Sequence, residues 1–510
     1  MPTPDHLRTR KQAVVVIHGI GGQRPMATLA NLVRTLVGER YGSKPDRMTG
    51  DTELRRLRAL VDGLKGELGE HLETDFYELY WADIVQDTSL GSLLKWLWSL
   101  TWRPVDRGNA QRWRLRRLKL AGVGMVVIAA GAAMLVLTKG YRSPSTGIGI
   151  LLGTGALGLL VKQFVLGPLL SVVGDAARYL SPEPENVAAR REIRRAGVNL
   201  LTSLHEDRGV DRIVIVGHSL GSIIGYDIIS QYWALKHVGT PVEAATLHAL
   251  TAAGKALCAA DPRSTSAGIV SPKVGASPTL WTQDAYVKAA ALFQQVRQAA
   301  FEATRAYARK PRAPARQPGM APEDRDYRPW LVSDFITVGS PLCYADFLFN
   351  GRAALEHSQA MGSVPSAPPE PLLDRDPIAV GKPASYGFKL HHSSRRYVYH
   401  HAAPFALTRW TNLYYPADPF SGPLREQYGI AIQDQELRGA PGEPRWWWRY
   451  NPLAHTRYWR TASGQPLEQA RAILAGIIFR PAWPKPDAQA AMPRPRNLGG
   501  GGDGTSGEAA

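Results

Sequence analysis

The stretch Asp211–Ser222 reads DRIVIVGHSLGS and places a serine between two glycines, directly after a β-branched run. The run Ile213–Val216 predicts a strand buried on both faces, and the following SIIGYDIISQYW predicts a helix. Between them, Gly217–Gly221 matches G-x-S-x-G in the strand–turn–helix setting that this pattern requires. A turn this tight leaves no room for a side chain two residues before or two residues after the serine, which explains both glycines. The stretch therefore predicts an α/β fold with Ser219 as a candidate nucleophile.

Other strands and helices alternate along the chain, whose 510 residues exceed what one hydrophobic core usually organises. The run AVVVIHGIGG predicts a first strand and its exit loop, and DFYELYWAD (Asp75–Asp83) predicts a second strand. Late strands are predicted within WLVSDFITVGSPL and RWTNLYYPADPFSG. Helices are predicted at Ala27–Arg40, Ala244–Ala260, Asp284–Arg309 and in LEQARAILAGII near the end. This alternation predicts an open, mainly parallel sheet covered on both faces.

Two long apolar runs interrupt the alternation. The first, 120–138, carries no charge, and the second, 147–170, carries only Lys162. An uncharged stretch of ~18 residues or more is long enough to cross the hydrocarbon core of a bilayer as a helix. The glycines of the second run would let two membrane helices approach closely, whereas they would weaken a soluble helix. We therefore expect a helical transmembrane hairpin, with a hairpin buried in a large soluble core as the alternative.

The chain is basic, with a formal net charge of +17, which indicates nucleic acid or an anionic membrane as a partner. Seven cations lie in 103–119, just before the first run, whereas the link between the runs carries only Lys139 and Arg142. Because basic residues favour the cytoplasmic side, we expect a cytoplasmic catalytic domain and anionic lipids, not nucleic acid, as partners. The N-terminus predicts no signal peptide. The two cysteines, Cys258 and Cys343, fit a reducing compartment.

An early histidine–glycine loop, His18–Gly22 (HGIGG), closes the predicted first strand. Loops of this kind supply a backbone N–H to the oxyanion site of serine hydrolases. The N–H of Ile20 or Gly21 and that of Leu220 would then point at the same developing negative charge. We expect His18 to shape this loop rather than to act as a base.

A serine hydroxyl becomes a good nucleophile when a histidine removes its proton and a carboxylate orients that histidine. In the pattern found here, the acid and then the histidine follow the serine along the chain. Asp418 follows a late strand between two prolines, Asp346 follows the preceding strand and competes with it, and Asp334 within that strand is less suited. His455 lies after Asp418 and is the candidate base. The other histidines considered precede Asp418 and are disfavoured: His391, His392, His400 and His401.

These segments resemble the α/β-hydrolase superfamily and, within it, lipase-like serine esterases. GHSLGS is similar to the lipase nucleophile turn, VVVIHGIGGQ to the oxyanion loop, ITVGSPL to a core strand and its turn, NLYYPADPFSG to the acid segment, and AHTRYW to the histidine loop. The resemblance covers Ala13–Asp83 and Arg190–Ile478 discontinuously. It implies Ser219 as nucleophile, Asp418 as orienting acid and His455 as base, with no metal or cofactor. Beside an apolar hairpin, such a site implies a membrane-anchored hydrolase of carboxylic esters of lipids or other amphiphiles.

The chain is accordingly divided into six parts. Residues 1–90 begin the hydrolase core, 91–180 hold the basic aromatic segment and hairpin, 181–240 carry the nucleophile turn, 241–330 form a helical insertion or lid, 331–480 complete the core with the acid and base loops, and 481–510 form a disordered tail. A non-catalytic membrane-associated scaffold on the same fold is the alternative function. A nucleic-acid binder, indicated by net charge alone, is a third.

Overall fold

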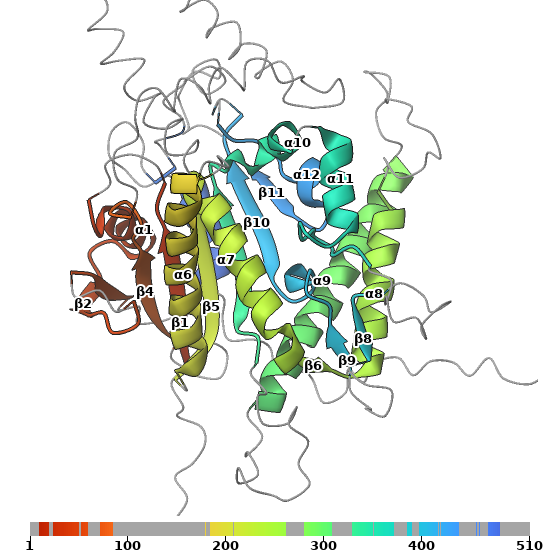
Figure 1. Cartoon of the computed structure of the whole chain (residues 1–510), viewed down its shortest axis with the longest axis horizontal. Coiled ribbons are helices and arrows are strands. Elements are labelled where there is room, and N and C mark those ends of the chain that lie inside the picture. The colour runs from red at the N-terminus through yellow and green to blue at the C-terminus, as the bar shows by residue number, and fades with distance from the viewer. Residues whose placement is uncertain are drawn as a thin grey trace, which may run out of the picture.

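An eight-stranded sheet with helices on both faces forms the centre of this computed structural model (Figure 1). The structure describes residues 10–19, 24–49, 53–59, 72–84, 179, 184–207, 209–261, 280–308, 329–349, 351–371, 385–389, 397–416, 418, 420–437, 455, 458–459 and 468–479. The strands of the large sheet are β1 (Arg10–Ile17), β2 (Tyr41–Pro45), β3 (Arg55–Ala59), β4 (Leu72–Leu79), β5 (Val210–His218), β7 (Val332–Val338), β10 (Arg409–Tyr414) and β11 (Gln433–Glu436). Their order is β11-β10-β7-β5-β1-β4-β3-β2.

The six strands from β11 to β4 run parallel, and β3 and β2 extend the edge as an antiparallel pair. The predicted α/β architecture with a mainly parallel sheet is thus confirmed. Ile17 lies opposite Gly217, and His218 lies opposite Val338, so the carboxyl ends of the central strands meet at one edge. The chain runs outward from β1 to β4 and then returns past β1 to β5. Ligands bind at such reversals in open α/β sheets, outside the carboxyl ends of the strands.

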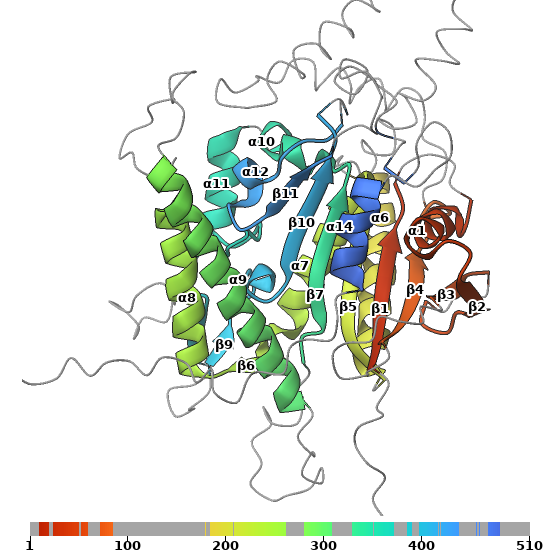
Figure 2. The same ribbon diagram turned by 180° about the vertical axis from the view of Figure 1, so that it is seen from behind.

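Alternate residues of β1 enter two hydrophobic cores, one on each face of the sheet. Val15 packs on the face covered by α6 and α7, which stand in front of the sheet in Figure 1. Val14 packs on the face covered by α1 and α14, which Figure 2 shows from behind. The bounds of these helices are α1 (Ala27–Val37), α6 (Pro184–Glu206), α7 (Leu220–Lys236) and α14 (Glu468–Ile478). A central strand buried on both faces explains the continuous run VVVI.

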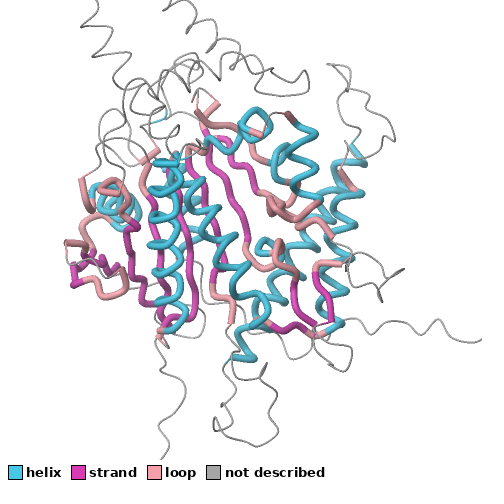
Figure 3. Tube along the Cα trace, in the orientation of Figure 1, coloured by secondary structure: helices cyan, strands magenta, loops and turns pink. Residues whose placement is uncertain are grey.

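The helical insertion after α7 consists of α8 (Ala244–Ala259) and α9 (Leu280–Ala308), close to the bounds predicted from the sequence. These two helices pack against each other and contact the small sheet of β6 (Pro241–Val242), β8 (Gly387–Lys389) and β9 (Tyr397–Tyr399). Figures 1 and 3 show them at the end of the molecule opposite β2. Their function as a lid stays a prediction. The shorter helices are α10 (Ala345–Leu348), α11 (Arg352–Ala360) and α12 (Arg425–Tyr428).

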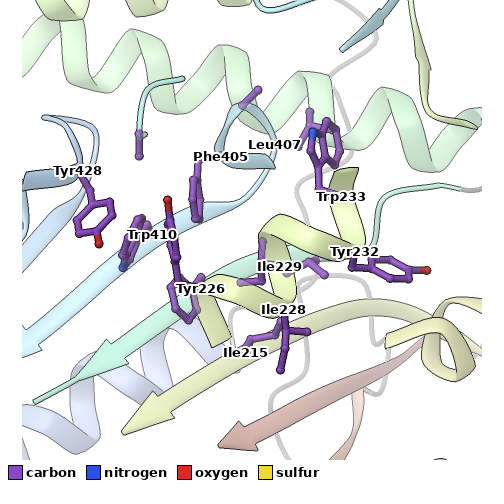
Figure 4. Close-up of a cluster of buried hydrophobic side chains, with 14 of the residues drawn as sticks. Ile215, Tyr226, Ile228, Ile229, Tyr232, Trp233, Phe405, Leu407, Trp410 and Tyr428 are labelled. Atoms are coloured by element: carbon purple, nitrogen blue, oxygen red, sulfur yellow. The ribbon is translucent and has the colours of Figure 1, made fainter. Parts of the chain in front are cut away.

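A cluster of buried aromatic side chains ties α7 to β10 (Figure 4). The rings of Phe405 and Trp410 are stacked with centroids 4.7 Å apart, and Tyr226 of α7 lies 5.5 Å from Trp410 and 5.2 Å from Tyr428. Aromatic pairs of this kind contribute ~0.5–1.5 kcal/mol each beyond the area they bury. The cluster therefore fixes the helix after the nucleophile turn relative to the strand that leads to Asp418.

The strand predicted at Asp75–Asp83 needs correction. It is β4, Leu72–Leu79, and it is the fourth strand of the chain because the β2–β3 hairpin precedes it. Asp75 is fully buried in this strand, where the guanidinium groups of Arg56 and Arg58 bind its carboxylate at 2.8 and 2.7 Å. A paired charge is tolerated in the interior of a protein. β4 can therefore begin in a segment whose polar residues do not predict a strand from the sequence.

The predicted transmembrane hairpin at 120–138 and 147–170 and the predicted tail at 481–510 lie outside the described residues. Within the described part of the chain, no helix has both the length and the apolar character needed to cross a bilayer. The hairpin therefore stays a prediction.

Candidate active site

Ser219 occupies the turn between β5 and α7 with φ +53° and ψ −125°. Non-glycine residues rarely adopt a positive φ, and such a conformation costs ~1–3 kcal/mol. Hydrogen bonds hold it in place: the Ser219 N–H donates to the Val338 carbonyl at 2.9 Å. The Ser219 carbonyl accepts the N–H of Ser222 at 2.9 Å and the Ser222 hydroxyl at 2.5 Å. The turn is thus fixed by its neighbours in β7 and α7.

The two glycines of the motif allow close contacts that any side chain would prevent. A Cβ atom on Gly217 would lie 2.6 Å from the Gly221 carbonyl oxygen, and one on Gly221 would lie 2.2 Å from the Ile17 carbonyl oxygen. Real Cβ atoms do not approach oxygen this closely. The first turn of α7 therefore lies directly against the end of β1.

The structure brings Ser219, His455 and Asp418 together. His455 Nε2 lies 2.8 Å from Ser219 Oγ, and His455 Nδ1 lies 2.9 Å from Asp418 Oδ2. Because an ionised carboxylate only accepts hydrogen bonds, Nδ1 carries the proton and Nε2 accepts the serine hydroxyl. All three side chains are buried. Asp418, and not Asp346 or Asp334, is therefore the aspartate that accepts the hydrogen bond of His455.

The Asp418 carboxylate accepts more than the histidine proton. Its Oδ1 accepts the N–H of Phe420 at 2.8 Å, and its Oδ2 also accepts the hydroxyl of Tyr458 at 2.6 Å. Burial by itself would raise the pKa of Asp418, but its electrostatic interaction with His455 and the hydrogen bonds from His455, Tyr458 and Phe420 hold this pKa below its ordinary value. Asp418 therefore stays ionised beside the histidine.

Tyr458 is a site residue that the sequence analysis missed. Its hydroxyl also lies 2.9 Å from Ser421 Oγ and accepts the N–H of Tyr415 at 3.3 Å. Its ring fills the space beside Gly339, where a Cβ atom would lie 2.7 Å from the ring carbon Cε2. Burial and the neighbouring Asp418 charge raise the pKa of Tyr458 well above its ordinary value, so it stays a donor. The sequence signal that could have identified Tyr458 is its position three residues after His455, the candidate base.

The competing aspartates have other surroundings. Asp346 is buried in α10, where its Oδ1 accepts the N–H of Phe347 at 2.7 Å. Asp334 is buried near the start of β7, where it pairs with Arg212 at 2.5 Å and with Arg409. Asp334 thus belongs to a buried ion cluster at the opposite end of the strands from Ser219.

The loop after β1 reaches the nucleophile. A Cβ atom on Gly19 would lie 2.8 Å from Ser219 Cβ, so the loop backbone contacts the serine. His18 Nδ1–H donates to the Gly19 carbonyl at 2.8 Å, and its Nε2 accepts the N–H of Trp81 at 3.2 Å. Burial lowers the pKa of His18 to about 4, against the opposite effect of the bond to Gly19. A neutral His18 with both ring nitrogens bonded agrees with a role in shaping the loop.

The predicted oxyanion donors are only in part within the structure. Leu220 is the first residue of α7, so its N–H has no acceptor inside the helix. Ile20 and Gly21 lie outside the described residues. Their part in the oxyanion site stays a prediction.

A second histidine, His218, lies beside the base. Its ring stacks on His455 with centroids 5.5 Å apart, and its Nε2–H donates to the His455 carbonyl at 3.4 Å. Burial, and to a lesser extent the electrostatic interaction with His455, lower the pKa of His218 to about 3. It therefore packs against the base as a neutral ring. Of the disfavoured histidines, His400 accepts the N–H of Ala402 at 3.1 Å, His401 is exposed, and His391 and His392 lie outside the described residues.

Comparison of the chain with protein-family models, with curated proteins and with solved structures returned no match. Among the described residues, no three His, Cys, Asp or Glu side chains are grouped so that they could hold a metal ion. The geometry around Ser219 is therefore the feature of this chain that indicates its chemistry.

Proposed function

We propose that this chain is a serine hydrolase of the α/β-hydrolase superfamily that cleaves carboxylic esters. One observation carries the proposal: the hydrogen bonds of 2.8 and 2.9 Å that link Ser219, His455 and Asp418 in series. The positive φ of Ser219 supports it, because a serine with no chemical task has no need of a strained turn. The position of the turn supports it too, at the strand-order reversal where open α/β sheets bind ligands.

In the first half of the reaction, Ser219 Oγ attacks the acyl carbonyl carbon while its proton passes to His455 Nε2. Asp418 stabilises the resulting imidazolium through the bond to Nδ1. The carbonyl oxygen becomes an oxyanion, for which Leu220 N–H and an amide of Ile20 or Gly21 are the proposed donors. The intermediate collapses, and His455 gives its proton to the departing alcohol oxygen.

In the second half, water replaces the alcohol. His455 removes a proton from this water, whose oxygen attacks the acyl carbon of the acyl-enzyme. The carboxylic acid leaves and the proton returns to Ser219 Oγ. The low pKa of Asp418 suits this cycle, because an ionised acid can stabilise the imidazolium in both halves.

The described residues on both sides of the apolar insertion support a substrate delivered by a membrane. Ile84 follows the carboxyl end of β4 by five residues, and α6 begins at the same edge (Figure 1). Tyr179 lies before α6. Its carbonyl accepts a hydrogen bond from the guanidinium of Arg190 in this helix at 2.7 Å, and its hydroxyl donates to the carboxylate of Asp227 in α7 at 2.7 Å. The described residues that flank the insertion thus lie at the edge of the sheet that carries Ser219. We include in the proposal lipid-like esters as substrates, anionic lipids as partners, and a membrane hairpin with a cytoplasmic catalytic domain.

A fluorophosphonate probe tests the proposal on the full chain in detergent, because such probes react with activated serines. The probe should label the wild type but not Ser219→Ala, and His455→Ala should lose turnover. Panels of esters, thioesters and phospholipids would then define the substrate. Undiminished labelling of Ser219→Ala would refute the nucleophile. A wild type that neither reacts nor turns over any ester would instead favour the non-catalytic scaffold.

A further inference from the structure

The carbonyl of Ser219 is held by a chain of hydrogen bonds that begins outside the catalytic residues. The Ser222 hydroxyl donates to the Ser219 carbonyl oxygen at 2.5 Å, and Ser340 Oγ lies 2.6 Å from Ser222 Oγ. The N–H of Leu342 donates to Ser340 Oγ at 3.2 Å. Ser222 and Ser340 are completely buried, so water does not compete for these bonds. We call the two hydroxyls with the Leu342 N–H the serine relay.

The direction of each bond in the serine relay follows from proton counting. A hydroxyl has one proton, and Ser222 uses its own on the Ser219 carbonyl. Ser340 must therefore donate to Ser222, while it accepts from Leu342. Every bond points toward the Ser219 carbonyl. Hydrogen bonds aligned in one direction polarise one another, so the last bond gains from those before it.

The relay acts on the peptide group that joins Ser219 to Leu220. In a trans peptide the C=O and the N–H point in opposite directions within one plane. A carbonyl held firmly by Ser222 therefore holds the Leu220 N–H firmly on the other side. Hydrogen bonds accepted by a carbonyl also polarise its peptide group, which makes its N–H a better donor.

We propose that Ser222 and Ser340 are positioning residues of the oxyanion site, whose hydroxyls aim and polarise the Leu220 N–H before substrate arrives. Neither residue touches substrate; both act through the Ser219–Leu220 peptide. This inference rests on the proposed function, in which Leu220 donates to the oxyanion. Donors fixed in advance stabilise the transition state most, because they need no reorganisation as the charge develops.

The first test removes one hydroxyl. Ser222→Ala keeps the Ser222 N–H bond to the Ser219 carbonyl but breaks the relay. With a 4-nitrophenyl ester, we expect kcat to fall about 10-fold at unchanged KM, less than the ~10²–10³-fold loss when an oxyanion donor is removed outright. Ser230→Ala is the matched control, because Ser230 lies in the same helix and its hydroxyl donates to the Tyr226 carbonyl at 2.7 Å. Its turnover should equal that of the wild type.

The second test asks whether the two hydroxyls act in series. Ser340 reaches the peptide only through Ser222, so Ser340→Ala should lower kcat and the double variant should be no slower than Ser222→Ala. A trifluoromethyl ketone, which forms an oxyanion on the nucleophile, gives an independent reading. Its Ki should rise by the same factor by which kcat/KM falls, because both report stabilisation of the oxyanion. General damage to the fold would not produce this proportion.

Each outcome decides. Turnover of Ser222→Ala equal to that of Ser230→Ala, or losses that add in the double variant, would overturn the inference while leaving the proposed function intact. A wild type without ester turnover would overturn both. If Ser222→Ala does not fold, Ser340→Ala alone decides, and an unchanged kcat and ketone Ki there would overturn the relay.

Discussion

Glu78 offers a quantitative test of the electrostatics at the edge that carries the site. It lies near the end of β4, opposite Val16 of β1, and is 1% exposed. Its Oε2 accepts the N–H of Met26 before α1, and its Oε1 has no hydrogen-bond partner among the described residues. Burial raises the pKa of Glu78 to about 7, against the lowering effect of hydrogen bonds from Met26 and Leu29. The folded protein therefore holds this carboxyl neutral well above the ordinary pKa of glutamate.

This raised pKa makes stability fall as pH rises. Between 4.5, the ordinary pKa of glutamate, and about 7, the folded chain binds a proton that the unfolded chain has released. The stability that Glu78 contributes is complete below 4.5 and is lost as pH rises through 7. A difference of about 2.5 pH units at ~1.4 kcal/mol each amounts to about 3.5 kcal/mol. Glu78→Gln is neutral at every pH, so it should match the wild type near ~pH 4 and exceed it by this amount above ~pH 8.

Urea unfolding of the full chain in detergent, followed by tryptophan fluorescence at several pH values, measures this difference. Glu39→Gln is the matched control, because the Glu39 side chain is 75% exposed, and it should keep the pH dependence of the wild type. A constant difference in the free energy of unfolding between Glu78→Gln and the wild type at all pH values would show that Glu78 ionises normally. Burial would then not raise the pKa of Glu78.

Four further substitutions test the site itself. Asp418→Asn should lower kcat by ~10⁴-fold, because an amide at this position favours the wrong tautomer of His455. Asp346→Asn should keep most of the turnover, and the rates of ester hydrolysis compare the two variants. Tyr458→Phe removes one of the hydrogen bonds that lower the pKa of Asp418. We therefore expect kcat to fall about 10-fold and the acid limb of the pH–kcat profile to move to higher pH. An acid limb at the same pH as in the wild type would contradict this role of Tyr458. Gly221→Ala places a Cβ atom 2.2 Å from the Ile17 carbonyl oxygen and should abolish fluorophosphonate labelling and lower the Tm; normal labelling at an unchanged Tm would contradict the close approach.

The central strands were predictable because parallel strands covered on both faces are continuous apolar runs. Val214 and Val216 face one core while Ile213 and Ile215 face the other, and no polar residue is needed between them. The edge strand β11 reads QDQE and has no such signal. It exists because its backbone pairs with β10 and because Asp434 accepts the N–H groups of Leu424 and Arg425 at the start of α12. Contacts of this kind depend on the folded arrangement and leave no periodic pattern.

The candidate site likewise contains residues that were predictable from the sequence and residues that were not. Chain order and local motifs were enough to single out Ser219, Asp418 and His455. Tyr458 and the serine relay were not predictable, because each depends on loops that meet only in space. Ser222 and Ser340 are 118 residues apart in the chain, and either serine alone is unremarkable in sequence. Hydroxyls that support a site through a shared peptide carry no motif of their own.

β1 and β5 are neighbours in the sheet, yet the chain between them includes both apolar runs. At ~5–20 residues per second, a ribosome needs roughly 10 to 40 s to add the ~190 intervening residues. During that time β1 has no β5 to pair with, and the turn that bears Ser219 does not exist. Under the proposed anchoring, the apolar runs meet the bilayer first and the sheet closes afterwards. Synthesis itself would then ensure that hydrolytic activity appears only on chains already inserted in their membrane.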